Sequence, residues 1–261
     1  MRLSGQVIWI TGASGGIGAA LARRFAREGA ALALTSRREA ELARVVAELP
    51  AGTRAIAVPG DVTELAAIPA WLARIEAELG PVDMLVANAG ISQRSRVRDT
   101  PLAIYRTLME VDFFAPVALA QAVLPGMLAR RRGHIVVTSS VAGKYGTPLR
   151  SGYCAAKFAL HGFFDALRAE SAKDGIDVTL LVAGPVRTDV SINALTADGS
   201  TYGVMDAMQA NGIPVDVAAE TILTGLLARE PEIVIAEGPS RDALELARTD
   251  PKALYALVAE R

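Results

Sequence analysis

A tyrosine and a lysine four residues apart are the pair of side chains best placed to do chemistry in this sequence. Tyr153 and Lys157 are separated by Cys-Ala-Ala, and two residues four apart on a helix project from the same face. A free phenol ionises near pH ~10, and a neighbouring ammonium favours the phenolate. A tyrosine in this setting can exchange a proton with a substrate oxygen. Because such pairs also occur on ordinary helices, the spacing alone does not establish catalysis.

A glycine-rich segment, Thr11 to Gly18, lies between an apolar run and an alanine-rich stretch. In a strand, turn and helix, Gly12 permits a tight exit from the strand, Gly16 lets a phosphate approach the backbone, and Gly18 allows close packing on the sheet. The helix N-terminus adds free N–H groups and the positive end of a dipole. This context favours a dinucleotide-phosphate site over a simple turn.

The elements that must position these residues are short apolar segments that alternate with helix-length ones. The predicted strands are residues 7–11, 31–35, 55–58, 84–87, 135–139, 178–182 and 233–236. Segments that are apolar at nearly every position need cover on both faces, which is typical of a parallel sheet between helices. The sequence therefore predicts a doubly wound α/β fold, Rossmann-like, with one domain over residues 1–261. Residues 189–212 are rich in small polar side chains and are predicted to form a substrate lid within it.

Composition and charge narrow the partners. Twenty-seven Lys and Arg oppose 28 Asp and Glu, so no global field attracts nucleic acid or an anionic membrane. A single cysteine, Cys154, forms no intrachain disulfide, and the sequence shows neither a secretory signal nor an apolar run of the roughly 20 residues that span a bilayer. His134 and His161 stand apart without clustered ligands, so no metal site is expected. We expect a cytoplasmic protein that acts on a small molecule.

These motifs resemble those of the short-chain dehydrogenase/reductase family. The glycine segment matches the family pattern TGxxxGxG, Asn88-Ala89-Gly90 matches its NAG element, and the tyrosine and lysine match YxxxK. The motifs follow the family's order and span most of the chain. The resemblance implies hydride transfer between nicotinamide and a ketone, aldehyde or alcohol. It is closest to the dehydrogenase/reductase subgroup that handles lipids or steroids.

The resemblance also implies roles for the catalytic residues. Ser140 ends the fifth predicted strand and is expected to hydrogen-bond the reacting oxygen, with Ser139 as the fallback. Tyr153 is the general acid or base, and Lys157 supports it.

The segment Ser36-Arg37-Arg38 stands where an acidic residue would repel a 2′-phosphate. Arg37 can donate charge-assisted hydrogen bonds to that phosphate, so the sequence favours NADP. Alternatively, both arginines form a solvated start of the next helix. Asp61 is expected to contact adenine, as the resemblance implies, to cap the helix that begins near Glu64, or to do both. The predicted cofactor-binding residues are Gly12, Ser14, Gly16, Ile17, Gly18, Ser36, Arg37, Asp61, Val62, Asn88, Tyr153, Lys157 and Thr188.

Asp112 stands where the family carries an asparagine that holds a water of the proton relay from the lysine. An aspartate accepts hydrogen bonds but does not donate as an amide does. Two hypotheses follow for this fourth catalytic candidate. Asp112 takes over the proton-relay role, or it forms a salt bridge with Lys157 and slows turnover.

Other interpretations stay open. A nucleotide-binding regulatory or scaffold protein with impaired turnover would explain Asp112, and an epimerase or dehydratase could share the fold. The basic residues Arg94, Arg96 and Arg98 favour a solvated loop over contact with an acidic substrate. The helices expected over residues 115–128 and 155–169 carry more apolar surface than one sheet face needs. That surplus favours a homodimer or homotetramer.

Overall fold

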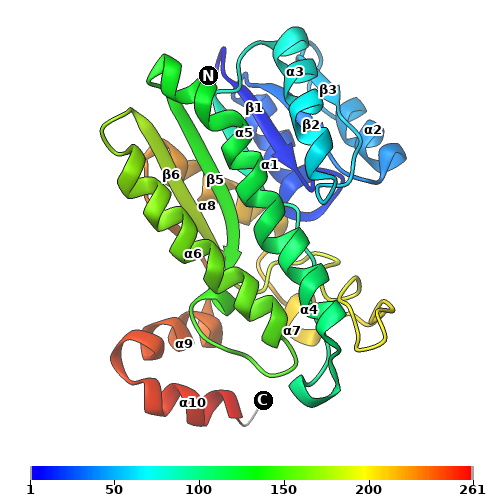
Figure 1. The fold of residues 1–261 in the computed structure, drawn as a ribbon, viewed down its shortest axis with the longest axis vertical. Coiled ribbons are helices and arrows are strands. Elements are labelled where there is room, and N and C mark those ends of the chain that lie inside the picture. Colours follow the sequence, from blue (N-terminus) through cyan, green and yellow to red (C-terminus); the bar gives the residue numbers. More distant parts are fainter. Residues whose placement is uncertain (1, 260–261) are drawn as a thin grey trace.

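A parallel sheet of seven strands forms the centre of the computed structural model, which describes residues 2–259 (Figure 1). The strands are β1 (Val7–Thr11), β2 (Ala31–Thr35), β3 (Ala55–Ala57), β4 (Met84–Ala87), β5 (Gly133–Ser140), β6 (Ile176–Ala183) and β7 (Glu232–Ile235). Their order is β3-β2-β1-β4-β5-β6-β7, so the direction of winding reverses between β1 and β4. Ligands of open parallel sheets bind at such a reversal, beyond the carboxyl ends of the strands.

Helices cover both faces of the sheet and bury its apolar strands. One hydrophobic cluster joins the sheet to α1 (Gly16–Arg27), α2 (Glu39–Ala47) and α8 (Val215–Leu227). A second cluster joins the other face to α3 (Ile68–Leu79), α5 (Ala115–Arg130) and α6 (Ser151–Ser171). β1 and β2 are buried along their whole length, which explains why they are apolar at consecutive positions.

The predicted doubly wound, Rossmann-like fold is confirmed. The predicted bounds of β1, β2 and β4 match the structure, whereas β5 and β6 are longer than predicted. Their pairing runs from Gly133 opposite Ile176 to Ser140 opposite Ala183, beyond the predicted bounds at both ends. Ser140 is therefore the last residue of β5.

One continuous helical run, Leu102–Arg130, comprises α4 (Leu102–Met109), a π-helical turn η3 (Glu110–Phe114) and α5. By length and composition alone it could cross a membrane. Its buried side packs against β4 and β5, and core helices meet the same criterion, so this is weak evidence for a membrane span. The expectation of a cytoplasmic protein without a membrane partner stays a prediction.

The last two helices, α9 (Gly238–Thr249) and α10 (Pro251–Ala259), extend the chain beyond the sheet (Figure 1). Leu254 and Val258 pack with Val141 and Tyr145, which follow the end of β5. The C-terminal helices therefore pack against the segment that leads from β5 to α6.

His134, the second residue of β5, is a buried histidine whose hydrogen bond is fixed by its neighbour. Its Nε2 lies 2.9 Å from Thr179 Oγ1, and the Thr179 hydroxyl donates to Glu230 O at 2.7 Å. Because the hydroxyl hydrogen is committed to Glu230, His134 Nε2 must donate. Burial lowers the pKa of His134 from 6.5 to about 4, and the charge of Asp177 opposes the shift only in part.

We expect acid to destabilise the protein through His134. A folded-state pKa below the unfolded value gives stability that is present above pH 6.5 and lost as the pH falls towards 4. The full effect is about 3 kcal/mol. Urea unfolding of wild type and His134→Gln at pH 7 and pH 4.5 measures it, because glutamine can still donate to Thr179 but does not titrate. A stability difference that does not change with pH would contradict this assignment.

Candidate active site

A cavity of about 780 Å³ opens at the carboxyl ends of the strands and brings together most of the predicted site residues. Its walls include the glycine turn, the ends of β4, β5 and β6, the start of α6 and parts of residues 189–209. The predicted residues that line it are Gly12, Ser14, Gly16, Ile17, Ser36, Arg37, Asp61, Val62, Asn88, Ser140, Tyr153, Lys157 and Thr188. Gly18 and Asp112 do not line it and lie behind its wall.

The glycine turn leaves backbone donors open at the start of α1. Gly12 has φ +66°, and a side chain there would meet Ala89, while a Cβ on Gly18 would lie 2.4 Å from Gly12 O. No side chain of the described residues caps α1, and its first turn carries no acidic residue. Uncapped N–H groups at a helix N-terminus bind phosphate oxygens. The turn therefore fits the phosphates of a dinucleotide.

The two adjacent arginines after β2 take different positions. Arg38 donates from Nε and Nη2 to Ser14 Oγ, at 3.2 and 3.0 Å, and the Ser36 hydroxyl donates to the same oxygen at 2.7 Å. Arg37 is exposed, with Nη1 3.5 Å from Asp61 Oδ2. The prediction named only Arg37 as a cofactor contact, yet Arg38 is the arginine that lies on the glycine turn.

Asp61 is held by Thr63 and not by a helix terminus. Its Oδ1 accepts from the Thr63 backbone N–H at 3.0 Å and from the Thr63 hydroxyl at 2.8 Å. Burial raises the pKa of Asp61, but the two Thr63 hydrogen bonds and the Arg37 charge outweigh it, and the net pKa lies below its ordinary value. The alternative of a cap is wrong in detail, because a 3-10 turn (Leu65–Ala67) precedes α3 and Asp61 does not cap it.

Asn88 braces three strands of the sheet. Its Nδ2 donates to Thr11 O of β1 at 3.1 Å, and its Oδ1 accepts from the Thr138 hydroxyl of β5 at 3.1 Å. Asn88 itself follows β4, so the three strands that frame the cavity are tied at one point.

Tyr153 and Lys157 lie together on the cavity side of α6. Lys157 Nζ is 5.6 Å from the centre of the Tyr153 ring and donates to Thr138 O at 3.0 Å. The Lys157 side chain is 4% exposed, so its charge acts with little screening by solvent. The structure thus places the two side chains as the helical spacing predicts.

The structure also separates the two serines at the end of β5. Ser139 Oγ lies against α6, 3.3 Å from Lys157 O and 2.9 Å from His161 Nε2. Ser140 Oγ donates to Ala183 O at 3.0 Å and accepts from the Ala142 N–H at 3.2 Å. Rotation of its hydroxyl would free the Ser140 proton for a ligand, whereas Ser139 is fixed in the packing between β5 and α6.

Asp112 lies on the π-helical turn η3 and is completely buried. Its Oδ1 accepts from the Ile91 N–H at 3.0 Å and lies 3.4 Å from Lys157 Nζ. Its Oδ2 has no hydrogen-bond partner among residues 2–259. Burial raises the pKa of Asp112, and the Lys157 charge opposes this only in part. The distance between Asp112 and Lys157 therefore fits the salt-bridge hypothesis, and the unpartnered Oδ2 keeps the relay hypothesis open.

Thr188 lies next to the glycine turn. A Cβ on Gly16 would come within 3.0 Å of Thr188 Cγ2, and the Thr188 hydroxyl accepts from Gln209 Nε2 at 3.1 Å. Gln209 belongs to α7 (Ala207–Ala210), so the segment predicted to be a lid is tied to the end of the cavity.

Several residues at this site had not been singled out from the sequence. Thr138 holds both Asn88 and Lys157, and Gln93 and Arg150 define the start of α6. The signal for Arg38 was present in the pair of arginines, whereas nothing in the local pattern marks Gln93. In the described part of the chain no group of three or more His, Cys, Asp or Glu could hold a metal ion.

A sequence model described as short chain dehydrogenase matches residues 6–198, about three quarters of the chain, and this match includes the glycine turn, Ser140, Tyr153 and Lys157. The chain is a short-chain dehydrogenase. The predicted family is thereby confirmed, and with it an oxidoreductase that acts on CH–OH groups.

Curated relatives of this short-chain dehydrogenase cover nearly all of its length. It is 40% identical over 266 residues to "Dehydrogenase/reductase SDR family protein 7-like" of Drosophila melanogaster, with 100% of this chain and 81% of that protein covered. It is 42% identical over 264 residues to "Dehydrogenase/reductase SDR family member 7B" of Bos taurus, with 98% and 81% covered.

Solved structures of similar proteins share the fold. A short-chain dehydrogenase from Streptomyces avermitilis superposes with a TM-score of 0.84 at 30% identity, covering 100% of this chain and 97% of that one. A metagenomic short-chain oxidoreductase in complex with NADP superposes with a TM-score of 0.75 at 31% identity, covering 90% and 98%. The likeness extends over the whole sheet.

Asp112→Asn tests the role of the buried carboxyl. The folded-state pKa of Asp112 is raised, so protonation of its carboxyl stabilises the folded protein. This contribution to the free energy of unfolding is complete below the ordinary aspartate pKa and is lost as the pH rises through the folded-state pKa. The asparagine oxygen can still accept from Ile91, so we expect the variant to gain stability relative to wild type between pH 4 and pH 8. Thermal midpoints across this range measure the trend. Identical pH–rate profiles of the two proteins would contradict both the relay and the salt-bridge hypotheses.

Proposed function

We propose that this short-chain dehydrogenase uses NADP to interconvert a ketone or aldehyde with an alcohol, with Tyr153 as the general acid or base. The observation that carries this proposal is the joint placement of Tyr153 and Lys157 in the cavity that begins at the glycine turn. The open N–H donors of α1 and the space along the strand ends fit a dinucleotide there.

The chain's own residues supply the acid–base part of the reaction. In the reducing direction Tyr153 donates its hydroxyl proton to the carbonyl oxygen, and the buried Lys157 ammonium stabilises the phenolate that forms. Ser140, after rotation of its hydroxyl, donates a second hydrogen bond to the same oxygen. When bound, the nicotinamide supplies or accepts the hydride. In the oxidising direction the Tyr153 phenolate takes the alcohol proton.

The preference for NADP over NAD is proposed from the end of β2. Residues 36–38, directly after this strand, include no acidic side chain; Ser36 and Arg38 contact Ser14 of the glycine turn, and Arg37 lines the same cavity. Two guanidinium groups in that place favour a 2′-phosphate. The metagenomic relative solved with NADP supports the same choice.

The impaired-turnover alternative has one observation in its favour. The Asp112 carboxyl contacts Lys157, and an ionised carboxylate there would weaken the effect of the ammonium on Tyr153. A nucleotide-binding protein with slow turnover is therefore the second candidate.

The proposal also includes a substrate lid over residues 189–212 and a homodimer or homotetramer that forms through α5 and α6. Exposed Phe114, Leu128 and Phe158 on or beside those helices support the contact between copies.

Tyr153→Phe should abolish most of the carbonyl reduction. Removing the proton donor is expected to lower kcat by about 100-fold or more, because general acid catalysis contributes that much. NADPH oxidation with a panel of ketones and aldehydes measures the loss, and fluorescence titration checks that NADPH still binds. Tyr255→Phe, an exposed tyrosine on α10, is the matched control. Full activity of Tyr153→Phe would refute the proposed mechanism.

Arg37→Ala and Arg38→Ala test the cofactor choice. Each should raise the KM for NADPH by about 10-fold or more and leave that for NADH nearly unchanged, since only NADPH carries the 2′-phosphate. Arg44→Ala serves as control, because Arg44 pairs with Glu48 on the exposed side of α2. If the KM for NADPH and the KM for NADH rise equally in both variants, the arginines are structural and the NADP proposal fails.

A further inference from the structure

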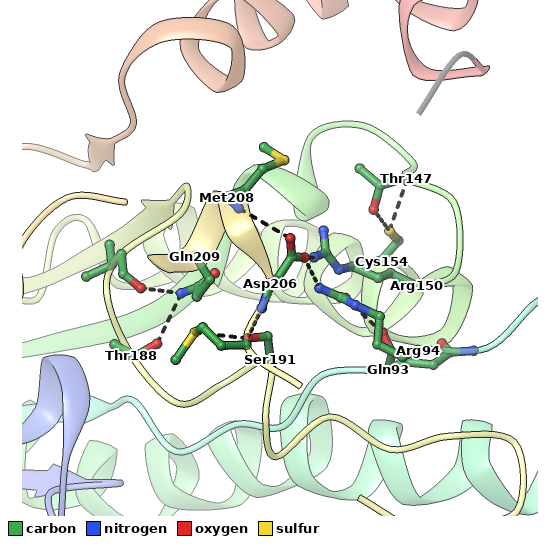
Figure 2. Close-up of polar contacts among 12 residues, drawn as sticks. Gln93, Arg94, Thr147, Arg150, Cys154, Thr188, Ser191, Asp206, Met208 and Gln209 are labelled. Atoms are coloured by element: carbon green, nitrogen blue, oxygen red, sulfur yellow. Dashed lines mark hydrogen bonds and ion pairs between the residues drawn. The ribbon is translucent and has the colours of Figure 1, made fainter. Parts of the chain in front are cut away.

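Two arginines share one aspartate at the wall of the same cavity (Figure 2). Arg94 follows β4, Arg150 immediately precedes α6, and Asp206 caps α7. Asp206 Oδ2 accepts from Arg94 Nη2 and, at 3.1 Å, from Arg150 Nη2. Two guanidinium groups and one carboxylate leave one positive charge without a counter-charge inside the cluster.

Arg94 has little capacity left for a ligand. Its side chain is 7% exposed, Nη1 donates to Gln93 O at 3.1 Å, and the guanidinium lies 5.8 Å from the centre of the Tyr202 ring. It holds Asp206 and the segment around Tyr202 against the loop after β4.

Arg150 lines the same cavity as Arg94 but is more exposed. Its side chain is 27% exposed, and within residues 2–259 its guanidinium makes a single hydrogen bond, to Asp206, although a guanidinium has five N–H donors. Burial, and after it the charge of Arg94, lowers the pKa of Arg150 despite Asp206. Asp206 balances only one of the two arginine charges. The arginine that still has free N–H donors is Arg150.

Buried hydrogen bonds of Gln93 hold the loop that carries Arg94 against the start of α6, next to Arg150. Gln93 is completely buried, and its Oε1 accepts from the Gly152 N–H of α6 at 2.7 Å, while its Nε2 donates to Ser95 Oγ at 3.0 Å. Leu149, just before Arg150, has φ +65°, a conformation that costs free energy in a residue with a side chain. The strained Leu149 and the buried Gln93 contact therefore lie on either side of Arg150 in the chain, at Leu149 and Gly152.

Arg150 precedes Tyr153 by three residues, so the two side chains start about one helical turn apart. Both side chains also line the same cavity, so a ligand whose carbonyl oxygen lies at Tyr153 shares that cavity with the Arg150 guanidinium. We propose, relying on the carbonyl reduction proposed above, that the substrate carries an oxyanion close to its carbonyl and that Arg150 binds this group. A carboxylate or a phosphate would meet the same donors.

Matched pairs of ketones test the proposal and distinguish the two oxyanions. 2-Oxobutanoate against 2-butanone probes a carboxylate, and hydroxyacetone phosphate against hydroxyacetone probes a phosphate. With saturating NADPH, we expect wild type to favour the anionic member of at least one pair in kcat/KM. Arg150→Met should lower kcat/KM for that anion by about 10- to 100-fold and for its neutral partner by less than about threefold. Arg96→Met, an exposed arginine of the same loop as Arg94, should change neither.

A second readout does not need turnover. With NADPH bound at saturation, inorganic phosphate or acetate should raise the thermal midpoint of wild type and of Arg96→Met but not of Arg150→Met. If no ketone is reduced by wild type while this shift depends on Arg150, the proposed function fails and the oxyanion site stands. No preference for either anion in wild type, or an equal loss on the anionic and neutral ketones in Arg150→Met, overturns the oxyanion proposal.

Discussion

A buried ammonium must be held by polar partners. In this chain the buried ammonium is that of Lys157. Its side chain is almost fully covered, and it donates to Thr138 O and contacts Asp112. Removing an ammonium from water is costly unless hydrogen bonds replace the lost hydration. Once these partners are in place, the low local dielectric makes the Lys157 charge strong at Tyr153. The requirement for these partners fixes β5, η3 and α6 relative to one another.

The sheet meets this requirement because its strands are parallel. Thr138 on β5, Asn88 after β4 and Thr11 on β1 lie at the same edge, and their hydrogen bonds connect the glycine turn to Lys157. Parallel strands all present their carboxyl ends at one edge, so short segments far apart in the sequence deliver side chains to one cavity. The family motifs fall where they do because each one follows a strand or begins a helix at that edge.

Local pattern accounts for the fold and for the part of the site that depends on local geometry. The bounds of β1 and β2 follow from short runs of apolar residues, and the common face of Tyr153 and Lys157 follows from helical spacing; both patterns act over a few residues. The choice between Arg37 and Arg38 does not, because it depends on Ser14, which is more than 20 residues away in the chain. The contact of Asp206 with Arg94 spans 112 residues and has no local signal at all. The π-helical turn that carries Asp112 is not predicted either, because residues 113–120 are all apolar and a run without polar positions does not show a change of helical phase.

The distribution of charge shows how a nearly neutral chain can hold an anionic ligand. The whole sequence has a formal net charge of -1, yet the described cavity is lined by five cationic side chains and only three carboxylates. The cations lie in two groups, Arg37 and Arg38 beside the glycine turn and Arg94 and Arg150 beside α6, with Lys157 as the fifth. In each group a single aspartate, Asp61 or Asp206, contacts an arginine and leaves one charge over. A concave surface with low-dielectric walls focuses such an excess of charge. The same arrangement that suits a phosphorylated dinucleotide at one group thus suits an oxyanion at the other.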